Sequence, residues 1–168
     1  MKISRSTLGL AAEFIVAGEL GRRNIYAQPT LGLQKRTDLL IFGENNKLLK
    51  LEVKSKQGRE WPNCKGIYGE NVMLVFVDFA GKREIERPDF YILTVQDWIR
   101  FAKNEIAKRP QKNITLDEHH VLIWHDEVNA GGKEYRGIGV RPEQIEEHKE
   151  RGDKIIWVVG QIKTDDNQ

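Results

Sequence analysis

Three residues in the first third of the chain, Asp38, Glu52 and Lys54, have the types and spacing of a metal-dependent hydrolytic site. Asp38 opens an apolar segment, and Glu52 and Lys54 lie two residues apart in another. Side chains alternate between the faces of a strand, so Glu52 and Lys54 share one face. Carboxylate oxygens suit Mg²⁺ or Mn²⁺, and a lysine beside them can orient a water molecule or stabilise charge on a phosphoryl oxygen. This combination indicates phosphodiester hydrolysis.

A β-hairpin is needed to bring these residues together. The segments 37–42 (TDLLIF) and 48–54 (LLKLEVK) have the composition of strands, and Gly43-Glu44-Asn45-Asn46 between them is typical of a turn. A five-residue loop over 43–47 predicts an antiparallel register that pairs Phe42 with Leu48, Leu40 with Lys50 and Asp38 with Glu52. A shift of one residue would separate the two acids. Adjacent carboxylates repel each other, and a divalent cation is the usual compensation.

Glu13 is a further candidate, on a predicted helix from Leu8 to about Arg22. Its neighbours one turn away, Gly9 and Ala17, are small and leave room for a metal, a water molecule or a phosphate. Spacing alone favours the plainer interpretation of Glu13 as a half-exposed helix residue. Ser6 and Thr7 are the expected caps of this helix, and Leu10, Ala11, Phe14, Ile15 and Gly18 its expected apolar face.

The remaining elements follow from hydrophobic periodicity and turn residues. We expect strands over 25–28, 72–79, 90–93, 121–124 and 134–140, a loop over 57–69, a helix from Thr94 to about Lys108, a polar helix from Pro142 to about Arg151, and a last apolar run over 155–159.

Length and composition bound the class of protein. The 168 residues, 39% apolar and 31% charged, predict a single domain over 1–168, with a core over about 6–103 and a C-terminal extension over 104–168. No apolar run is long enough to span a membrane, the N-terminus lacks the pattern of a signal peptide, and Cys64 is the single cysteine, so a cytoplasmic protein is expected. Residues 1–66 carry 12 Lys and Arg against 6 Asp and Glu, whereas the rest carries 15 against 19, so a polyanion would meet the N-terminal part first.

The order of these segments resembles the core of the PD-(D/E)XK nuclease superfamily, and is similar to Holliday-junction resolvase and homing-endonuclease cores. The matching pieces are LGLAAEFIVAGEL, TDLLIF and LEVKSK, followed by VMLVFVDF, with Thr37 in place of the proline that names the family. The resemblance covers residues 6–102. It implies an α/β, restriction endonuclease-like fold with a mixed central sheet flanked by helices. It further implies Mg (or Mn) held by Asp38, Glu52 and the Val53 carbonyl, Lys54 as catalytic lysine and Glu13 as accessory acid.

Residues near the expected site could contact a nucleic acid. Trp61 and Tyr68 could stack on a base, although Trp61 fits equally well as a packed loop anchor. His119, His120, His125 and Asp126 match no metal-binding motif and suit exposed strand ends. The candidate phosphate contacts are Arg22, Arg23, Lys35, Arg36, Lys56 and Arg59.

The function favoured by these observations is that of a metal-dependent DNA endonuclease, which could act as a homodimer. Two other classes stay open. One is a non-catalytic nucleic-acid-binding module that keeps the fold, and the other is a partner within a defence complex.

Overall fold

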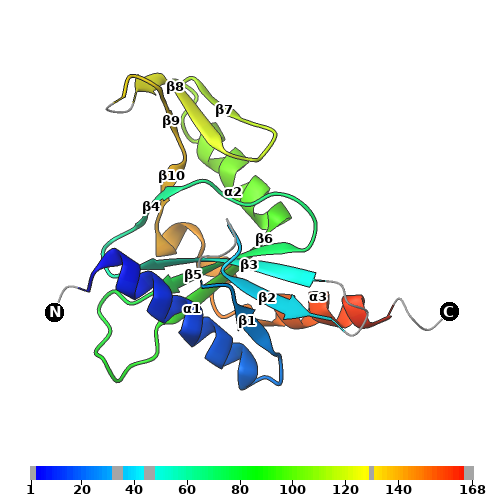
Figure 1. The fold of residues 1–168 in the computed structure, drawn as a ribbon. Coiled ribbons are helices and arrows are strands. Elements are labelled where there is room, and N and C mark those ends of the chain that lie inside the picture. Colours follow the sequence, from blue (N-terminus) through cyan, green and yellow to red (C-terminus); the bar gives the residue numbers. More distant parts are fainter. Residues whose placement is uncertain (1–2, 32–35, 44–47, 129–130, 165–168) are drawn as a thin grey trace.

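The protein is a mixed α/β structure built on a five-stranded mixed sheet, as seen in a computed structural model that describes residues 3–31, 36–43, 48–128 and 131–164 (Figure 1). The sheet has the order β1-β2-β3-β5-β6, and two smaller sheets pair β4 with β10 and β7 with β8 and β9. The strands are β1 (Ala27–Pro29), β2 (Leu39–Phe42), β3 (Leu48–Lys56), β4 (Trp61–Cys64), β5 (Val72–Asp78), β6 (Asp89–Thr94), β7 (Ile114–Leu116), β8 (Leu122–Val128), β9 (Glu134–Arg136) and β10 (Ile138–Val140). The helices are α1 (Arg5–Gly21), α2 (Val95–Ala107) and α3 (Asp153–Thr164), with short 3₁₀ turns η1 (Pro142–Gln144) and η2 (Glu146–His148).

The parallel pair β3 and β5 forms the centre of the main sheet, with antiparallel neighbours on both sides. The apolar, β-branched run of β5 is buried at six of its seven positions, as expected for a strand covered on both faces. The strand predicted over 72–79 is therefore confirmed, and so is the strand predicted over 90–93, which is β6.

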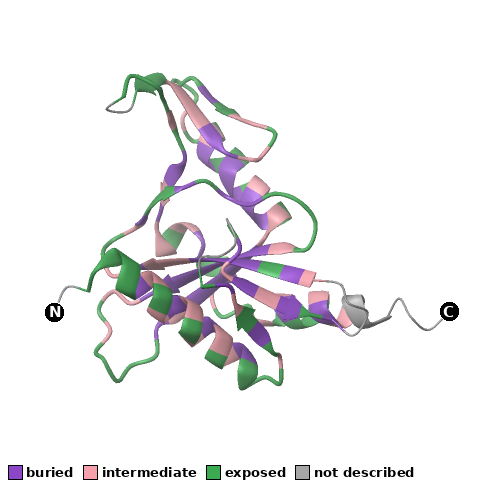
Figure 2. Ribbon diagram, in the orientation of Figure 1, coloured by how far each residue is buried: buried purple, intermediate pink, exposed green. Residues whose placement is uncertain are grey.

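Two hydrophobic cores cover the two faces of the main sheet (Figure 2). Met73, Val75 and Val77 of β5 face the core that includes α1 and α3. Leu74 and Phe76 face the second core, which includes α2, β4 and β10. Within the described residues, no helix is both long enough and apolar enough to cross a membrane.

Helix α1 differs from its prediction at its start and in its buried face. Ser4, not Ser6 or Thr7, caps the helix by accepting from the Thr7 N–H. The buried stripe is Leu8, Ala12, Val16 and Leu20, spaced four residues apart, whereas Leu10 and Phe14 are exposed. The predicted face was wrong because the apolar residues surround much of this helix, so periodicity alone did not single out the packed side.

Helix α2 begins as predicted. Thr94 caps it by accepting from the Asp97 N–H, while the Asp97 carboxylate accepts from the Thr94 N–H, which is a capping box. Trp98 and Ala102 of this helix are fully buried.

The other corrections to the predicted elements concern residues 57–69 and the C-terminal part of the chain. The predicted loop 57–69 contains strand β4, which pairs with β10 rather than with a sequence neighbour. The predicted helix from Pro142 consists of two separate 3₁₀ turns. The apolar run 155–159 lies in helix α3, whose Ile155 and Val159 join the core under α1, so the C-terminal extension completes the main core.

Candidate functional site

The predicted hairpin register is observed along the whole described ladder. Phe42 pairs with Leu48, Leu40 with Lys50, and Leu39 with Leu51. The predicted turn 44–47 lies outside the described residues. Asp38 stands one residue before β2, beyond the last pair of the ladder, Leu39 with Leu51, and its N–H donates to the Leu51 carbonyl at 2.9 Å.

Asp38 is fixed by its backbone and its side chain. Its carbonyl accepts from the Thr30 N–H at 2.9 Å, and its Oδ2 accepts from the Val53 N–H at 2.6 Å. The N–H and C=O of one strand residue point toward the same neighbouring strand. The Val53 carbonyl is therefore directed to the side of β3 on which Asp38 lies.

Glu52 is buried and is contacted by two cations. Lys54 Nζ lies 2.8 Å from Glu52 Oε1, and Arg36 Nε lies 3.5 Å from Glu52 Oε2. Glu52 and Lys54 extend from the same face of β3, the face that also carries the second core. The Lys54 side chain keeps 40% of its surface exposed, so a ligand arriving from solvent can reach it.

Glu13 faces this site from α1. The pKa of Glu13 is raised by burial and, to a smaller extent, by the negative charge of Asp38. Glu13 is half-buried, with Ala12 and Val16 of the same helix fully packed beside it. The effect of Asp38 on the pKa of Glu13 indicates that the two carboxylates lie within electrostatic range of each other, which the helix pattern alone did not favour.

The electrostatics of Asp38 fit a site that gains from a bound cation. Burial raises the pKa of Asp38 and the nearby Glu52 carboxylate raises it further, while the Val53 N–H and Lys54 act in the opposite direction. The ionised form of Asp38 therefore carries a cost that added positive charge would offset.

The donor set fits Mg²⁺ by type. Asp38, Glu52 and the Val53 carbonyl offer hard oxygen atoms, and Mg²⁺ commonly binds through one or two protein carboxylates with water completing its shell. Among the residues that the structure describes, no group of three or more His, Cys, Asp or Glu side chains is arranged to hold a metal ion. A two-carboxylate site with water ligands is thus the arrangement that these residues could provide.

The predicted nucleic-acid contacts divide into three groups. Arg36 lies in the site, and Arg59 is exposed, whereas Arg22 and Arg23 pair with Glu19 at the far end of α1. Lys35 lies outside the described residues.

Lys56 and Trp61 are core residues, which corrects their assignment as surface contacts. Lys56 is 5% exposed and its Nζ lies 2.6 Å from Asp78 Oδ1 on the neighbouring strand. Trp61 is 1% exposed, donates from Nε1 to the Val77 carbonyl, and lies against the Lys56 ammonium. A buried lysine requires such a partner, so Lys56 serves packing rather than a ligand.

Cys64 and the histidines do not form a second reactive centre. Burial raises the pKa of the Cys64 thiol to about 12, so the thiolate needed of a nucleophile is not formed near neutral pH. His120 and His125 bond to the Ile67 carbonyl and to Thr115, which are structural contacts.

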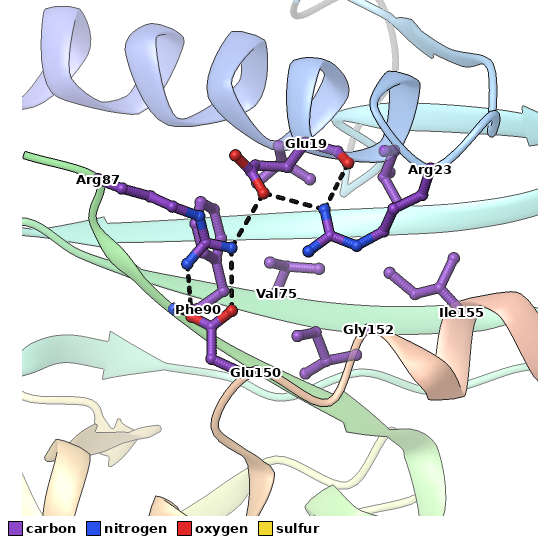
Figure 3. Close-up of a pocket in the computed structure, with 11 residues that line it drawn as sticks. Glu19, Arg23, Val75, Arg87, Phe90, Glu150, Gly152 and Ile155 are labelled. Carbon is purple, nitrogen blue, oxygen red and sulfur yellow. Dashed lines mark hydrogen bonds and ion pairs between the residues drawn. The ribbon is translucent and has the colours of Figure 1, made fainter.

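The structure holds two depressions that are not lined by Asp38, Glu52 or Lys54. A recess of about 40 Å³ between α1, β5, β6 and the start of α3 is lined by apolar side chains and closed by Glu19, Arg87 and Glu150 (Figure 3). This space holds little more than a water molecule or two. A wider groove of about 1000 Å³ runs between the start of α1 and residues 55–63, and Ser55 in its wall directly follows Lys54.

The role of Arg36 as a partner of Glu52 was missed, because Arg36 was expected only as a phosphate contact. It adopts a left-handed backbone conformation, with φ of 58°, and its guanidinium donates to the Gly66 carbonyl from the other side of Glu52. Sequence offers no signal for this contact across thirty residues.

Searches against protein-family models, curated proteins and solved structures found no match to this chain.

Proposed function

We propose that this protein is a Mg²⁺-dependent nuclease of the PD-(D/E)XK type that hydrolyses phosphodiester bonds in DNA. The observation that supports the proposal is the hydrogen bond from the Val53 N–H to Asp38 Oδ2, at the strand position between Glu52 and Lys54, whose side chains form an ion pair. Glu13 of α1 lies within electrostatic range of Asp38. The mixed sheet with α1 on one face and α2 on the other is compatible with a restriction endonuclease-like fold (Figure 1).

Each residue has a role that its position supports. Asp38 and Glu52, with the Val53 carbonyl, would hold the metal ion, and Glu13 would act as an accessory acid beside them. Lys54, next to Glu52 and open to solvent, orients the attacking water and stabilises negative charge on the phosphoryl oxygen. A bound Mg²⁺ would polarise that oxygen and lower the pKa of the water molecule.

The decisive experiment compares Glu52→Gln with Glu147→Gln. Glu147 belongs to the other Glu-x-Lys sequence of the chain and its side chain is 72% exposed, so it controls for the motif without the site. Mn²⁺ is titrated into each protein by calorimetry, and cleavage is measured on duplex, single-stranded and branched DNA. We expect Glu52→Gln to lose metal binding and at least a hundredfold of the cleavage rate, with Glu147→Gln unchanged.

Cleavage that survives in Glu52→Gln would overturn the assignment.

A second candidate function, a nucleic-acid-binding module without turnover, is favoured by the two cationic side chains that already pair with Glu52. It predicts salt-dependent DNA binding by the parent protein with no metal-dependent cleavage.

A further inference from the structure

Three partly exposed side chains, Arg36, Tyr68 and His119, contact one another in sequence next to Glu52. The Arg36 guanidinium, which contacts Glu52, lies 5.1 Å from the centre of the Tyr68 ring. The Tyr68 and His119 ring centres are 4.2 Å apart and the rings are tilted by 57°. The two rings pack against each other, yet 40% of Tyr68 and 46% of the His119 side chain stay exposed. We call Arg36, Tyr68 and His119 the aromatic platform.

The backbone that presents Tyr68 is held rigidly. Ile67 is 1% exposed in the second core, and its carbonyl contacts His120 Nδ1 at 3.2 Å. Gly66 has φ of +67°, and a Cβ at this position would lie 1.9 Å from the Trp98 indole, so the segment is pressed directly onto α2. Trp98 in turn donates to the His120 carbonyl at 2.8 Å. A large exposed ring on such a support binds with little loss of conformational entropy.

The platform and the candidate metal ligand share one residue. The same guanidinium contacts Glu52 and lies over the Tyr68 ring, so a group stacked on the platform would share Arg36 with the candidate site. Exposed aromatic rings accept nucleobases of any sequence, and a neighbouring arginine adds a favourable cation–π interaction.

We propose that the aromatic platform binds an unpaired nucleobase next to the phosphodiester bond that is cut, so that the substrate is nucleic acid with unpaired nucleotides at the site. This inference rests on the proposed nuclease function and adds the substrate class. A base inside a duplex has both faces covered by its neighbours, so only an unpaired or splayed base can stack on Tyr68. A base-stacking role also accounts for the charge of Arg36, since a protein partner would not require a cation between the ring and the acid.

The test uses a short single-stranded oligonucleotide carrying 2-aminopurine, whose fluorescence is quenched by stacking, and the same strand paired in a duplex. Each oligonucleotide is titrated into four proteins, namely the parent, Tyr68→Ala, Tyr68→Phe and Tyr26→Ala. The buffer contains Ca²⁺, which carboxylates also bind. Tyr26 is the matched control because it is also exposed, directly precedes the edge strand β1 and donates from its hydroxyl to Gln28 of that strand. We expect Tyr68→Ala to lose the quenching and weaken single-strand binding by about tenfold, with Tyr68→Phe and Tyr26→Ala unchanged.

Unchanged quenching and affinity in Tyr68→Ala would overturn the proposal, and so would an equal loss for the single strand and the duplex. Failure of the aromatic platform can be distinguished from failure of the nuclease function. If the parent protein cuts DNA but Tyr68→Ala binds as well as the parent, only the platform is rejected. If the parent neither cuts nor binds any of these oligonucleotides, the nuclease proposal is rejected with it, and a protein partner becomes the occupant to test.

Discussion

Asp38 shows how a single side chain is held in an unfavourable state. Its carboxylate is desolvated and lies near two other acids, and the pKa of Asp38 is raised by these causes. Its Oδ2 also satisfies the Val53 N–H, a group that would otherwise lack a partner beyond the start of β2. The hydrogen bond favours keeping an acceptor at this position, while the negative charge works against stability.

Two substitutions at Asp38 separate these contributions. Asp38→Asn keeps an acceptor and removes the charge, so without metal we expect an unfolding free energy equal to the parent or higher by up to about 1 kcal/mol. Asp38→Ala also removes the acceptor and leaves the Val53 N–H unsatisfied, which costs about 1–3 kcal/mol. Denaturant unfolding in EDTA measures both, and a loss in Asp38→Asn as large as in Asp38→Ala would contradict the argument. Neither variant should cut DNA.

At the scale of elements, a cluster of ion pairs joins α1, the β5–β6 loop and the segment before α3 (Figure 3). Arg87 Nη2 lies 3.0 Å from Glu19 Oε2 on α1, and Arg87 Nη1 lies 2.9 Å from Glu150 Oε1. Arg23 also contacts Glu19, at 2.9 Å. The hydrogen bond from Arg87 is the main cause that lowers the pKa of Glu19 to about 2. The cluster therefore fixes α1, and with it Glu13, against the rest of the fold.

Replacing Arg87 should loosen this connection in a pH-dependent way. Arg87→Met keeps an aliphatic side chain over the Phe90 ring but removes both ion pairs, and we expect a loss of about 1–2 kcal/mol in unfolding free energy at pH 7. Because the pKa of Glu19 is lowered on folding, its contribution is complete above about pH 4.5 and is lost as the pH falls toward 2. The difference between parent and variant should therefore shrink over this range.

Arg83→Met is the control on the same loop, since Arg83 is exposed and pairs locally with Glu86. We expect no measurable change in its stability. A difference between parent and Arg87→Met that stays constant from pH 7 to pH 2.5 would show that packing, not charge, is responsible.

At the scale of the whole molecule, the last helix belongs to the same core as the first. Ile155 and Val159 of α3 pack in the hydrophobic cluster formed with α1 and β5, so α1 and α3 cover the same face of the main sheet. The predicted division into a core over 6–103 and an extension is thus a division in sequence, while the packing unites both parts.

Two adjacent isoleucines test this integration. Ile155 is 2% exposed and Ile156 is 50% exposed on the same helix. We expect Ile155→Ala to lower the unfolding free energy by about 3 kcal/mol through lost burial and cavity formation, and Ile156→Ala to change it by less than about 0.5 kcal/mol. A single cooperative transition in thermal unfolding of both variants is expected, and a separate early transition in Ile155→Ala would show that α3 unfolds independently.

The hairpin that carries the candidate residues was predictable because its determinants are local. Alternation along 48–54 and the length of the 43–47 connection were enough to predict the pairing of Phe42 with Leu48 and of Leu40 with Lys50. The strand β5 and the capped start of α2 were predictable for the same reason, since a buried run and a Thr–Asp capping box act within a few residues.

Other features depended on contacts between distant segments. Composition marked Lys56 as a surface cation, yet the parallel pairing of β3 with β5 sets it against Asp78 and under Trp61. The pairing of β4 with β10 and the buried face of α1 likewise depend on which surfaces meet, not on the segments themselves.

The sequence by itself therefore determined β5, β6, the start of α2 and the register of the β2–β3 hairpin, because propensity, alternation and turn length operate over short distances along the chain. Only the tertiary structure decided that Glu13 faces Asp38, that Arg36 joins Glu52 to Tyr68, and that Trp61 belongs to the core. Burial and electrostatic coupling arise when segments far apart in sequence pack together, so the pattern within one segment does not predict them.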